Sequence, residues 1–431
     1  MRTKTCDLND GMEDVELKGR IVSKRDFGNL IFLALRDDTG SAQAWLNKSF
    51  LGEKFDKNAL KYGDFVRLEG NSFKTDSGVT TLNVVNYEVY SRALDPLPDK
   101  RKGISKRKGY IHRGLEILTN EETFDRFKKI NKMTESIRSF LFQRGYQETD
   151  TGILQKEEDS SPSGTFYTYS DHLKKNLVLR KSKEQRMKQL MVGGFEKIFE
   201  IGKSFRNGQI TRKYHPEING LELYDAYSDW KDMLSLTVDL LENLNLEFGV
   251  PKSNPQEFER INFYDLIKEN FGIDGRFASL DEIKKMIPSK RLRNYQNNDT
   301  GRAFSLMDLV GFGLERYSNK NIILWGIPKQ ISVLSKSSIE EPSLAEEFRY
   351  FVKGNSFCYG NTELIDPLEQ EKRLLEQSRY ESKEIDLSKD PFLKLMRLGM
   401  PPMGGLGIGL DRLFSIYLEK DSVKDVIYFP L

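Results

Sequence analysis

Over residues 15–90, apolar and polar residues alternate in short runs. This period of two is typical of β-strands with one buried face. Segments rich in Gly, Asp, Asn and Thr, which favour turns, separate the runs at 27–29, 37–40 and 75–78. The predicted strands are 15–23, 29–37, 41–48, 64–70 and 80–90. Five short strands in so short a segment predict a small closed β-barrel.

A helical pattern begins next to Asn120. Asn is a good N-cap residue, and Glu121 and Glu122 suit the first turn of a helix. Apolar residues then recur every three to four positions, as one buried helix face requires. This face contains Phe124, Phe127, Ile130, Met133, Ile137, Phe140 and Leu141. Arg144 and Gly145 end the predicted helix.

Beyond this helix, strand-like and helical patterns alternate without the regular spacing of βαβ units. The strand-like runs are 198–205, 220–227, 321–327 and 351–357, and the helical runs are 233–248 and 369–380. The predicted fold class is therefore α+β. We expect an N-terminal barrel of the OB type, whose face commonly binds single-stranded nucleic acid, and then an antiparallel sheet flanked by helices.

A polar, basic stretch separates the two parts. Residues 96–113 contain Pro, Gly and seven Lys or Arg residues, which marks a domain boundary. We expect a barrel domain at 1–95, a basic linker at 96–117 and a second domain at 118–431. A cationic linker is either solvated surface or a contact for a nucleic-acid backbone, and both interpretations stay open.

The composition narrows the possible classes of protein. The 67 Lys and Arg residues nearly balance the 65 Asp and Glu residues, so nucleic-acid binding must come from local patches. The two cysteines, Cys6 and Cys358, and three histidines have no metal-like spacing, which excludes a disulfide scaffold and structural zinc. The N-terminus lacks an apolar leader, and no stretch approaches the roughly 18 apolar residues of a membrane span. We expect a cytoplasmic protein with no membrane partner.

Glycines alternate in residues 405–412, which read Gly-Leu-Gly-Ile-Gly-Leu-Asp-Arg. Without Cβ atoms, a strand can approach a ligand closely. Only 19 residues follow Arg412, too few for the βαβ unit of a dinucleotide-binding fold. We instead predict a strand that leads into a helix, with Arg412 on the first helical turn. A guanidinium group in that position suits an adenine face or a phosphate.

Residues 198–227 read as strand, polar loop and strand. Arg206 lies where the first strand ends, and the returning strand contains Glu222 and Tyr224. A spacing of two places the latter two side chains on one face of the strand. An arginine fork beside them could hold a phosphate and a carboxylate together while they react.

These segments resemble the class II aminoacyl-tRNA synthetases, and specifically the class II lysyl-tRNA synthetases. The resemblance covers nearly the whole chain. Besides the OB-like region, its segments are ALDPLPDK, HRGLEILTN, VGGFEKIFEIGKSFRN, PEINGLELYDAYSDWKD, ELIDPLEQEKR, PPMGGLGIGLDR and VKDVIYFP. It implies an anticodon-binding-like barrel, a class II catalytic domain, and ATP and Mg²⁺ as cofactors. It also implies tRNA and a lysine-like amino acid as partners, and a homodimer formed through the helix at 120–144 and the strand after it.

The resemblance assigns the catalytic arginines. Arg206 matches the motif 2 arginine, which contacts the amino acid carboxylate and the ATP α-phosphate. Arg412 matches the motif 3 arginine, which packs on adenine and the γ-phosphate. His215 and Ile218 lie in the same ATP-binding region, where the family has an asparagine and an aromatic residue.

The resemblance also assigns the amino acid pocket. Glu363 and Tyr224 match the pair that receives the lysine side-chain ammonium, and Glu184 and Glu222 match carboxylates that complete the pocket. A substrate with two ammonium groups requires several converging carboxylates, which agrees with this assignment.

Several positions depart from the family pattern. Gly208 replaces a glutamate of motif 2, and Tyr214 replaces a histidine of the motif 2 loop. Ser356 replaces one of two glutamates that usually hold magnesium, which leaves Glu363 as the expected metal ligand. Gly152 replaces the motif 1 proline.

The walls of the amino acid pocket also depart from the family pattern. Tyr359 and Asn361 stand beside the lysine side chain where the family has asparagine and phenylalanine, so a modified or β-amino lysine is a conceivable substrate.

On the barrel, Arg20, Phe32 and Gln43 match positions that read a uridine-rich anticodon. Stacking on Phe32 would contribute about 1 to 3 kcal/mol per base. Val79 stands where the family has a discriminating glutamate, and its side chain forms no hydrogen bond, so we expect poor discrimination among anticodons. The other interpretation places Phe32 in the barrel core, because every second strand residue points inward.

Two classes of function follow from the resemblance. The first is an ATP-dependent ligase that activates lysine or a close analogue as an adenylate and transfers it to tRNA. The second is a diverged paralogue that binds an amino acid, nucleotide or RNA without charging tRNA, or that aminoacylates another acceptor. Arg206 and Arg412 favour the ligase, whereas Gly208, Ile218 and Ser356 favour the paralogue.

Overall fold

The computed structural model describes every residue except 1, 96, 99–103, 159–163, 253, 318–319, 381–386 and 388–389. The chain divides into two units, residues 1–105 and 106–431. Part of the expected basic linker, at 96 and 99–103, lies outside the described residues.

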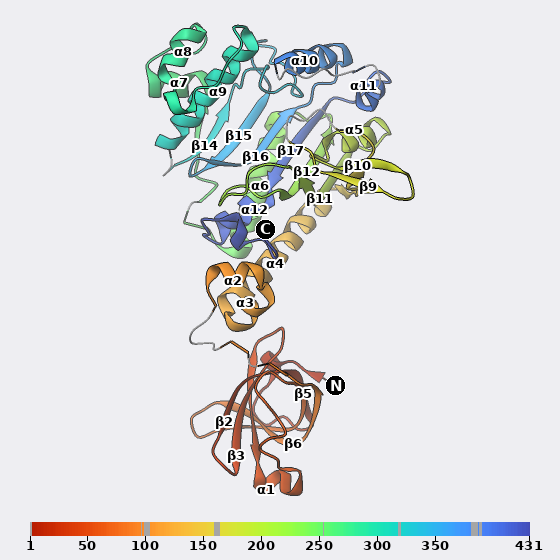
Figure 1. The fold of residues 1–431 in the computed structure, drawn as a ribbon, viewed down its shortest axis with the longest axis vertical. Coiled ribbons are helices and arrows are strands. Elements are labelled where there is room, and N and C mark those ends of the chain that lie inside the picture. The colour runs from red at the N-terminus through yellow and green to blue at the C-terminus, as the bar shows by residue number, and fades with distance from the viewer. Residues whose placement is uncertain are drawn as a thin grey trace. The chain divides into compact units, whose positions relative to one another are not determined.

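Strands that close on themselves form the N-terminal unit (Figure 1). The elements are β1 (Arg2–Thr3), η1 (Thr5–Asp7), β2 (Val15–Asp26), β3 (Leu30–Arg36), β4 (Ser41–Asn47), α1 (Lys48–Leu51), η2 (Gly52–Lys54), β5 (Phe65–Lys74) and β6 (Thr80–Ser91). The strand order is β1-β2-β3-β4-β6-β5, and β2 also pairs with β5. This pairing closes β2 to β6 into the predicted five-stranded barrel, which is confirmed, while β1 adds a short parallel pairing to β2.

Alternation along each strand separates the barrel core from its outer face. In β3, Ile31, Leu33 and Leu35 are buried, whereas Leu30 and Phe32 are only half-buried. The buried residues join those of the other strands in one apolar core. The period of two in the sequence therefore corresponds directly to the inward and outward faces of the barrel.

The second unit combines helices with a large sheet. Its elements up to α6 are α2 (Lys106–Ile111), α3 (Arg113–Thr119), α4 (Glu121–Gln143), β7 (Gln147–Glu148), β8 (Leu154–Gln155), β9 (Tyr167–Ser170), β10 (Lys175–Leu179), α5 (Glu184–Val192), β11 (Lys197–Phe205), β12 (Glu217–Ala226) and α6 (Trp230–Phe248). The later elements are β13 (Glu259–Asn262), α7 (Phe263–Phe271), α8 (Leu280–Met286), η3 (Ser289–Arg291), α9 (Asp299–Arg316), β14 (Asn321–Trp325), β15 (Glu347–Val352), β16 (Asn355–Thr362), α10 (Pro367–Tyr380), α11 (Pro391–Met396), β17 (Met403–Gly409), α12 (Leu410–Tyr417) and η5 (Val423–Asp425).

Among the described residues, eight strands form the large sheet in the order β13-β14-β15-β16-β17-β12-β11-β7. The central pairings from β14 to β11 are antiparallel, as predicted, but β13–β14 and β7–β11 at the two edges are parallel. The sheet is therefore mixed. Parallel neighbours need a long connection, and here α7, α8 and α9 join β13 to β14, while β8 to β10 and α5 join β7 to β11.

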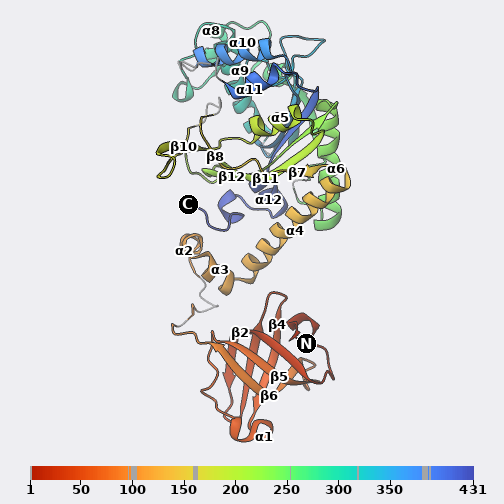
Figure 2. The ribbon, with the colours of Figure 1, turned by 90° about the vertical axis from the view of Figure 1, so that its right-hand side faces the viewer.

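Helices cover both faces of this sheet (Figure 2). Helices α4, α6 and α12 pack on one face around Ile137, Leu241 and Phe414 in the largest apolar cluster. On the other face, α5 and α11 contribute Met187, Met191 and other residues to a second cluster, which includes side chains of β11 and β12.

The predicted helix at 120–144 is confirmed as α4. Its N-cap residue is Asn120, whose side-chain oxygen accepts a hydrogen bond from the backbone N–H of Thr123. The predicted buried positions lie in the core, except that Phe124 is only half-buried. The apolar spacing of a helix was therefore sufficient to predict this element.

The run at 351–357, expected as one strand, is instead the turn of the β15–β16 hairpin. Lys353 and Gly354 have φ angles of 49° and 71°. Two adjacent residues with positive φ are typical of a tight hairpin turn, and only Gly adopts this conformation readily. The apolar residues on both sides concealed the turn in the sequence.

Residues 106–111 and 113–117 of the expected linker are helical. They belong to α2 and α3, where Arg113 is fully buried. Its guanidinium group donates hydrogen bonds to the backbone carbonyls of Lys424, Ile427 and Tyr428. Arg113 therefore anchors the C-terminal segment and is not a contact for nucleic acid. Across the described part of the chain, no helix is long and apolar enough to pass through a lipid bilayer.

Candidate active site

Strand β17 is the centre of the site, because its glycines leave room for pocket side chains on both neighbouring strands. Gly407 pairs with Glu222 of β12 and Tyr359 of β16, and Gly405 pairs with Tyr224 and Asn361. A Cβ atom on Gly407 would lie 2.5 Å from the Tyr359 ring, and one on Gly405 would overlap the Glu363 carboxylate. The glycines therefore make space for neighbouring side chains. The predicted strand, which leads into a helix with Arg412 on its first turn, is confirmed.

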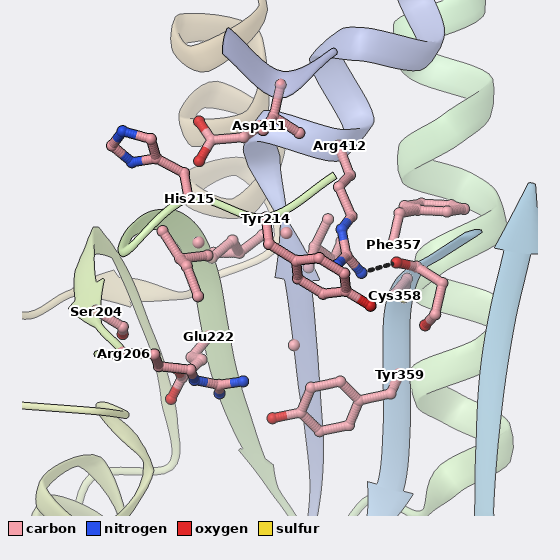
Figure 3. Close-up of a pocket in the computed structure, with 18 of the residues that line it drawn as sticks. Ser204, Arg206, Tyr214, His215, Glu222, Phe357, Cys358, Tyr359, Asp411 and Arg412 are labelled. Carbon is pink, nitrogen blue, oxygen red and sulfur yellow. Dashed lines mark hydrogen bonds between the residues drawn. The ribbon is translucent and has the colours of Figure 1, made fainter. Parts of the chain in front are cut away.

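A cavity of about 240 Å³ opens beside this strand (Figure 3). Its walls include six of the predicted site residues: Arg206, His215, Ile218, Glu222, Tyr359 and Arg412. Arg206 follows the end of β11, where its backbone N–H donates to the carbonyl of Pro216. The hairpin of β11 and β12 and the start of α12 thus bring Arg206 and Arg412 to the same cavity.

Two contacts with residues outside α12 fix the side chain of Arg412. Its Nη1 donates a hydrogen bond to the backbone carbonyl of Ser356, and its guanidinium carbon lies 5.2 Å from the centre of the Tyr214 ring (Figure 3). A flat guanidinium group facing an aromatic ring makes a favourable cation–π contact. Tyr214, which the sequence had marked only as a departure, therefore contacts Arg412 directly.

His215 has a structural role in this geometry. Its Nε2 accepts a hydrogen bond of 3.0 Å from the backbone N–H of Leu431, and its Nδ1 lies 2.9 Å from the carbonyl of Glu217. In the tautomer with its proton on Nδ1, the ring accepts from Leu431 through Nε2 and donates to the Glu217 carbonyl through Nδ1. Both ring nitrogens are occupied, so His215 fixes the β11–β12 loop against the C-terminus.

A buried charged cluster forms the inner end of the site. The Lys188 ammonium lies 2.6 Å from Glu184 Oε1 and 2.5 Å from Glu363 Oε2. It also lies 5.8 Å from the ring centre of Tyr224, which is itself buried. Asn361 is also buried here, and it pairs with Gly405, on which a Cβ atom would meet the Glu363 carboxylate. The structure therefore brings together Glu184, Tyr224, Asn361 and Glu363, which the resemblance assigns to the amino acid pocket.

The environment of this cluster perturbs its acids and bases. Burial raises the pKa of Glu363 to about 7, although the Lys188 ammonium opposes this shift. Burial would lower the pKa of Lys188, but the charges of Glu184 and Glu363 outweigh it and raise that pKa to about 12. Burial, followed by the charges of Glu184 and Glu363, raises the pKa of Tyr224 well above its usual value.

Tyr359 joins the inner cluster to the cavity. Desolvation raises the pKa of its hydroxyl well above the usual value, and the charges of Glu222 and Glu184 add to this effect, while Arg206 opposes it. Tyr359 lines the cavity, and Asn361, two residues further along β16, pairs with Gly405, on which a Cβ atom would meet the Glu363 carboxylate. The inner cluster and the cavity are two ends of one site.

At the cavity end, Glu222 already has a cationic neighbour. The ammonium of Lys183 lies 3.5 Å from Glu222 Oε1, and the hydroxyl of Ser182 lies 3.4 Å from Glu222 Oε2. Lys183 is 1% exposed and lies just before α5. Sequence analysis missed both Lys183 and Lys188. The spacing of Glu184 and Lys188 by four residues, which suits an ion pair on a helix, was the available signal for Lys188.

The residues present do not fit a magnesium ion held by the protein itself. Magnesium prefers carboxylate oxygens, but Glu363, the expected ligand, is paired with Lys188. The carboxylates on the cavity wall are Glu222, beside Lys183, and Asp411, which accepts a hydrogen bond from the N–H of Asn219. Within the described ranges, no three His, Cys, Asp or Glu side chains form a metal-binding group.

On the barrel, the residues assigned to the anticodon lie on the outer face. Phe32 pairs across the strands with Trp45, and their ring centres are 5.9 Å apart. Phe27 and Phe73 extend this aromatic row, at 5.8 Å from Phe32 and 4.4 Å from Trp45. The interpretation of Phe32 as a core residue is wrong, because the buried side chains of β3 are the alternate ones.

The two polar residues assigned to the anticodon, Gln43 and Arg20, also lie on the outer face of the barrel. Gln43 lies on the same face of β4 as Trp45, and its side-chain oxygen accepts a hydrogen bond from Thr81. Arg20 stacks on Phe65 with its guanidinium carbon 4.3 Å from the ring centre. Val79 is 45% exposed in the turn before β6. The surface combines aromatic faces with polar side chains, as proteins that bind single-stranded nucleic acid commonly do.

The site as a whole can align a carboxylate with a phosphate. Arg206 and Arg412 present two guanidinium groups to one cavity, while the inner end carries more carboxylates than cations. Guanidinium groups bind phosphates and carboxylates, and the acidic end suits an amine. This arrangement suits the joining of an amino acid to a nucleoside phosphate.

Comparison with known proteins agrees with this geometry. Residues 106–431 match the family model described as tRNA synthetases class II (D, K and N), and residues 15–91 match an OB-fold nucleic acid binding domain. A lysine–tRNA ligase of Thermotoga maritima is 36% identical over 97% of this chain and 86% of that protein. Similar enzymes of Fervidobacterium nodosum and Trichormus variabilis are 34% and 32% identical, over 97% and 100% of this chain and 84% and 82% of their own lengths.

The family match covers the whole second unit, including both arginines, and the relatives align with nearly the full chain. Class II synthetases use ATP to join an amino acid to tRNA, which fits a cavity with two arginines and a separate nucleic acid binding barrel. The chain therefore belongs to the class II aminoacyl-tRNA synthetases of the D, K and N group.

Proposed function

We propose that the protein is a lysine–tRNA ligase, which activates lysine with ATP and transfers it to tRNA. The main support for this proposal is the net charge of the inner cluster, which contains Glu184, Lys188 and Glu363. Glu184 and Glu363 contribute two negative charges when ionised, and Lys188 contributes one positive charge, which leaves one negative charge buried. A buried charge without a partner is unfavourable, so the pocket selects a substrate with a distal cation. The names of the relatives support lysine.

The reaction has two steps. The substrate carboxylate attacks the α-phosphorus of ATP, and pyrophosphate leaves with the bonding electrons. A terminal ribose hydroxyl of tRNA then attacks the acyl carbon, and AMP leaves. Arg206 would bind the carboxylate and the α-phosphate together, and Arg412 would bind the nucleotide beside Tyr214. Positioning and charge stabilisation are the contributions of these residues.

In this proposal, magnesium would enter the site bound to the phosphates of ATP. Magnesium commonly keeps most of its ligands as water and phosphate oxygens, so it needs few ligands from the protein. With Glu363 paired to Lys188, we assign no protein carboxylate to the ion.

A direct test is amino-acid-dependent exchange of label between pyrophosphate and ATP, measured with each standard amino acid in turn. We expect exchange with lysine and little with aspartate or asparagine, because neither supplies a cation for the inner cluster. Greater exchange with aspartate than with lysine would contradict the proposal.

The diverged-paralogue function has one specific observation in its favour. Glu363, expected to receive the side-chain ammonium, and Glu222, expected to complete the pocket, each have a lysine of the chain beside them. A protein that binds a nucleotide without activating an amino acid would need no free carboxylate there. ATP binding without exchange for any amino acid would support this second function.

We also propose a homodimer, formed beside strand β7 at the edge of the sheet. Phe142 near the end of α4, Ile153 and Leu154 after β7, and Phe195 before β11 are each 40% to 56% exposed. Gly152, which replaces the expected proline, has a φ angle of 74° that proline cannot adopt. A second copy would cover this apolar edge. Light scattering at micromolar concentration should give twice the chain mass, and a monomer there would contradict the dimer.

Two further expectations accompany the ligase. The barrel would bind the anticodon of tRNA through Phe32, Gln43 and Arg20, which lie on its outer face. Because tRNA charging takes place where proteins are made, we propose that the protein acts in the cytoplasm.

A further inference from the structure

Lys183 is a buried cation inside the site, and it lies on the wall of the cavity. Its ammonium is 3.5 Å from Glu222 Oε1, 3.2 Å from the carbonyl of Gly202 and 3.5 Å from the hydroxyl of Ser204. Its backbone N–H also lies 3.5 Å from Glu222 Oε1. Lys183 and Glu222 therefore form a pair that belongs to the protein before any substrate arrives.

This pair lies where the α-ammonium group of an amino acid would bind. Arg206 would hold the substrate carboxylate, and the α-amine is attached to the next carbon. The α-ammonium must therefore bind near Arg206, on the same cavity wall as Glu222. Asp411, the other carboxylate on that wall, is buried and accepts a hydrogen bond from the backbone N–H of Asn219. Among the carboxylates that line the cavity, Glu222 is therefore the partner that we assign to an α-ammonium, while Glu184 stays with Lys188 at the inner end.

The two ends of the site differ in their charge balance. At the inner end, two carboxylates face one ammonium, so one negative charge remains for a distal substrate amine. At the cavity end, the single charge of Glu222 is matched by Lys183, so none remains for a second amine. Two ammonium groups at one carboxylate repel each other, and a desolvated ammonium without a partner is unfavourable.

We infer that Lys183 occupies the place of the substrate α-ammonium at Glu222, and that the site accepts carboxylic acids with a distal amine whether or not they carry an α-amine. The inference rests on the proposed function, because it concerns the same activation reaction. It makes Lys183 a specificity-determining residue and ω-amino carboxylic acids the substrate class. The acid is still activated through its carboxylate, with pyrophosphate as the leaving group.

The test compares L-lysine with 6-aminohexanoate, which has the same chain length and distal amine but no α-amine. Pyrophosphate exchange is measured with each acid over a range of concentrations. For the unmodified protein, we expect values of kcat/KM that agree within about threefold, because the α-ammonium gains no net contact at Glu222. A preference for lysine above about thirtyfold would overturn the inference.

The variant Lys183→Met removes the charge and keeps much of the side-chain length. It leaves Glu222 free, so we expect kcat/KM for lysine to rise at least about tenfold over that for 6-aminohexanoate, since a charged hydrogen bond becomes available. The matched control is Lys181→Met, because Lys181 is also buried but lies 3.7 Å from Glu158 and not on the cavity wall. The control should leave the ratio of the two acids unchanged.

The outcomes separate this inference from the proposed function. Lysine-dependent exchange with the same acid ratio in Lys183→Met as in the unmodified protein overturns the inference and leaves the ligase intact. No exchange with either acid in the unmodified protein overturns the ligase, and the inference with it. If Lys183→Met fails to fold, calorimetric binding of the two acids to the unmodified protein decides, since tight binding of lysine alone also overturns the inference.

Discussion

Arg206 and Arg412 have different tasks at one cavity, although both are guanidinium groups. Arg206 is exposed at the end of β11, whereas Arg412 is held by the carbonyl of Ser356 and the ring of Tyr214. Arg412 is therefore already fixed for a nucleotide, and Arg206 is free to contact the groups that react. This difference gives the two residues separable kinetic effects.

We expect Arg206→Ala to lower the rate of adenylate formation by roughly a hundredfold or more, because a charged contact directed at the transition state is lost. Arg412→Ala should mainly raise the KM for ATP. Steady-state exchange kinetics at varied ATP separate the two effects. An unchanged rate in Arg206→Ala would sink the assignment of Arg206.

Glu363 predicts a dependence of lysine binding on pH. Burial raises its pKa to about 7, so the carboxyl is ionised above that pH and becomes neutral below it. Because a neutral carboxyl leaves the inner cluster without its excess negative charge, the KM for lysine should rise as the pH falls through about 7. Exchange measured from about pH 8 to about pH 6 tests this.

The variant Glu363→Gln is the control for this pH dependence. It should bind lysine weakly at every pH and lose the dependence on pH near 7, while the KM for ATP stays as it was. The assignment fails if the variant keeps the same pH profile as the unmodified protein.

At the scale of the element, strand β17 determines whether the pocket exists. A Cβ atom on Gly405 would overlap the Glu363 carboxylate and approach the Tyr224 ring to 3.0 Å. We expect Gly405→Ala to raise the KM for lysine at least about tenfold and to lower the stability of the second unit by about 1 to 3 kcal/mol, through overpacking.

Gly409→Ala is the matched control for Gly405→Ala. Its added Cβ atom would lie 3.6 Å or more from its neighbours, which is ordinary van der Waals contact. Thermal melting and exchange should both stay close to those of the unmodified protein. Equal damage from the two substitutions would show that the effect comes from the strand backbone and not from the pocket.

The sequence predicted elements well where one periodicity dominated. Helix α4 and the barrel strands follow their apolar spacing, because one face of each is buried. The hairpin at Lys353 and Gly354 was missed, since its turn lies between apolar runs and only its backbone angles mark it.

The site was predictable in part. The resemblance named residues that do meet at the site, such as Arg206 and Glu363, but it gave no partners for them. Lys183 was not predicted. It lies just before α5 and contacts Glu222 of β12, which is far away in the sequence. A pairing of this kind depends on the tertiary fold.

At the scale of the whole molecule, the protein combines a catalytic unit with a barrel that presents an aromatic row to solvent. Phe32 and Trp45 are the centre of this row. We expect Phe32→Ala to weaken binding of single-stranded RNA about tenfold, because one stacking platform is lost. Phe50→Ala, at an exposed residue of α1 outside the row, is the control. No change in filter binding with Phe32→Ala would rule out Phe32 as a stacking platform.

The central claim is that this molecule joins lysine to tRNA, and the most direct measurement is charging of unfractionated tRNA with labelled lysine, aspartate and asparagine in separate reactions with ATP. The account predicts that lysine alone becomes attached to tRNA through an alkali-labile ester. Attachment of aspartate or asparagine in preference to lysine, or of no amino acid, would contradict it.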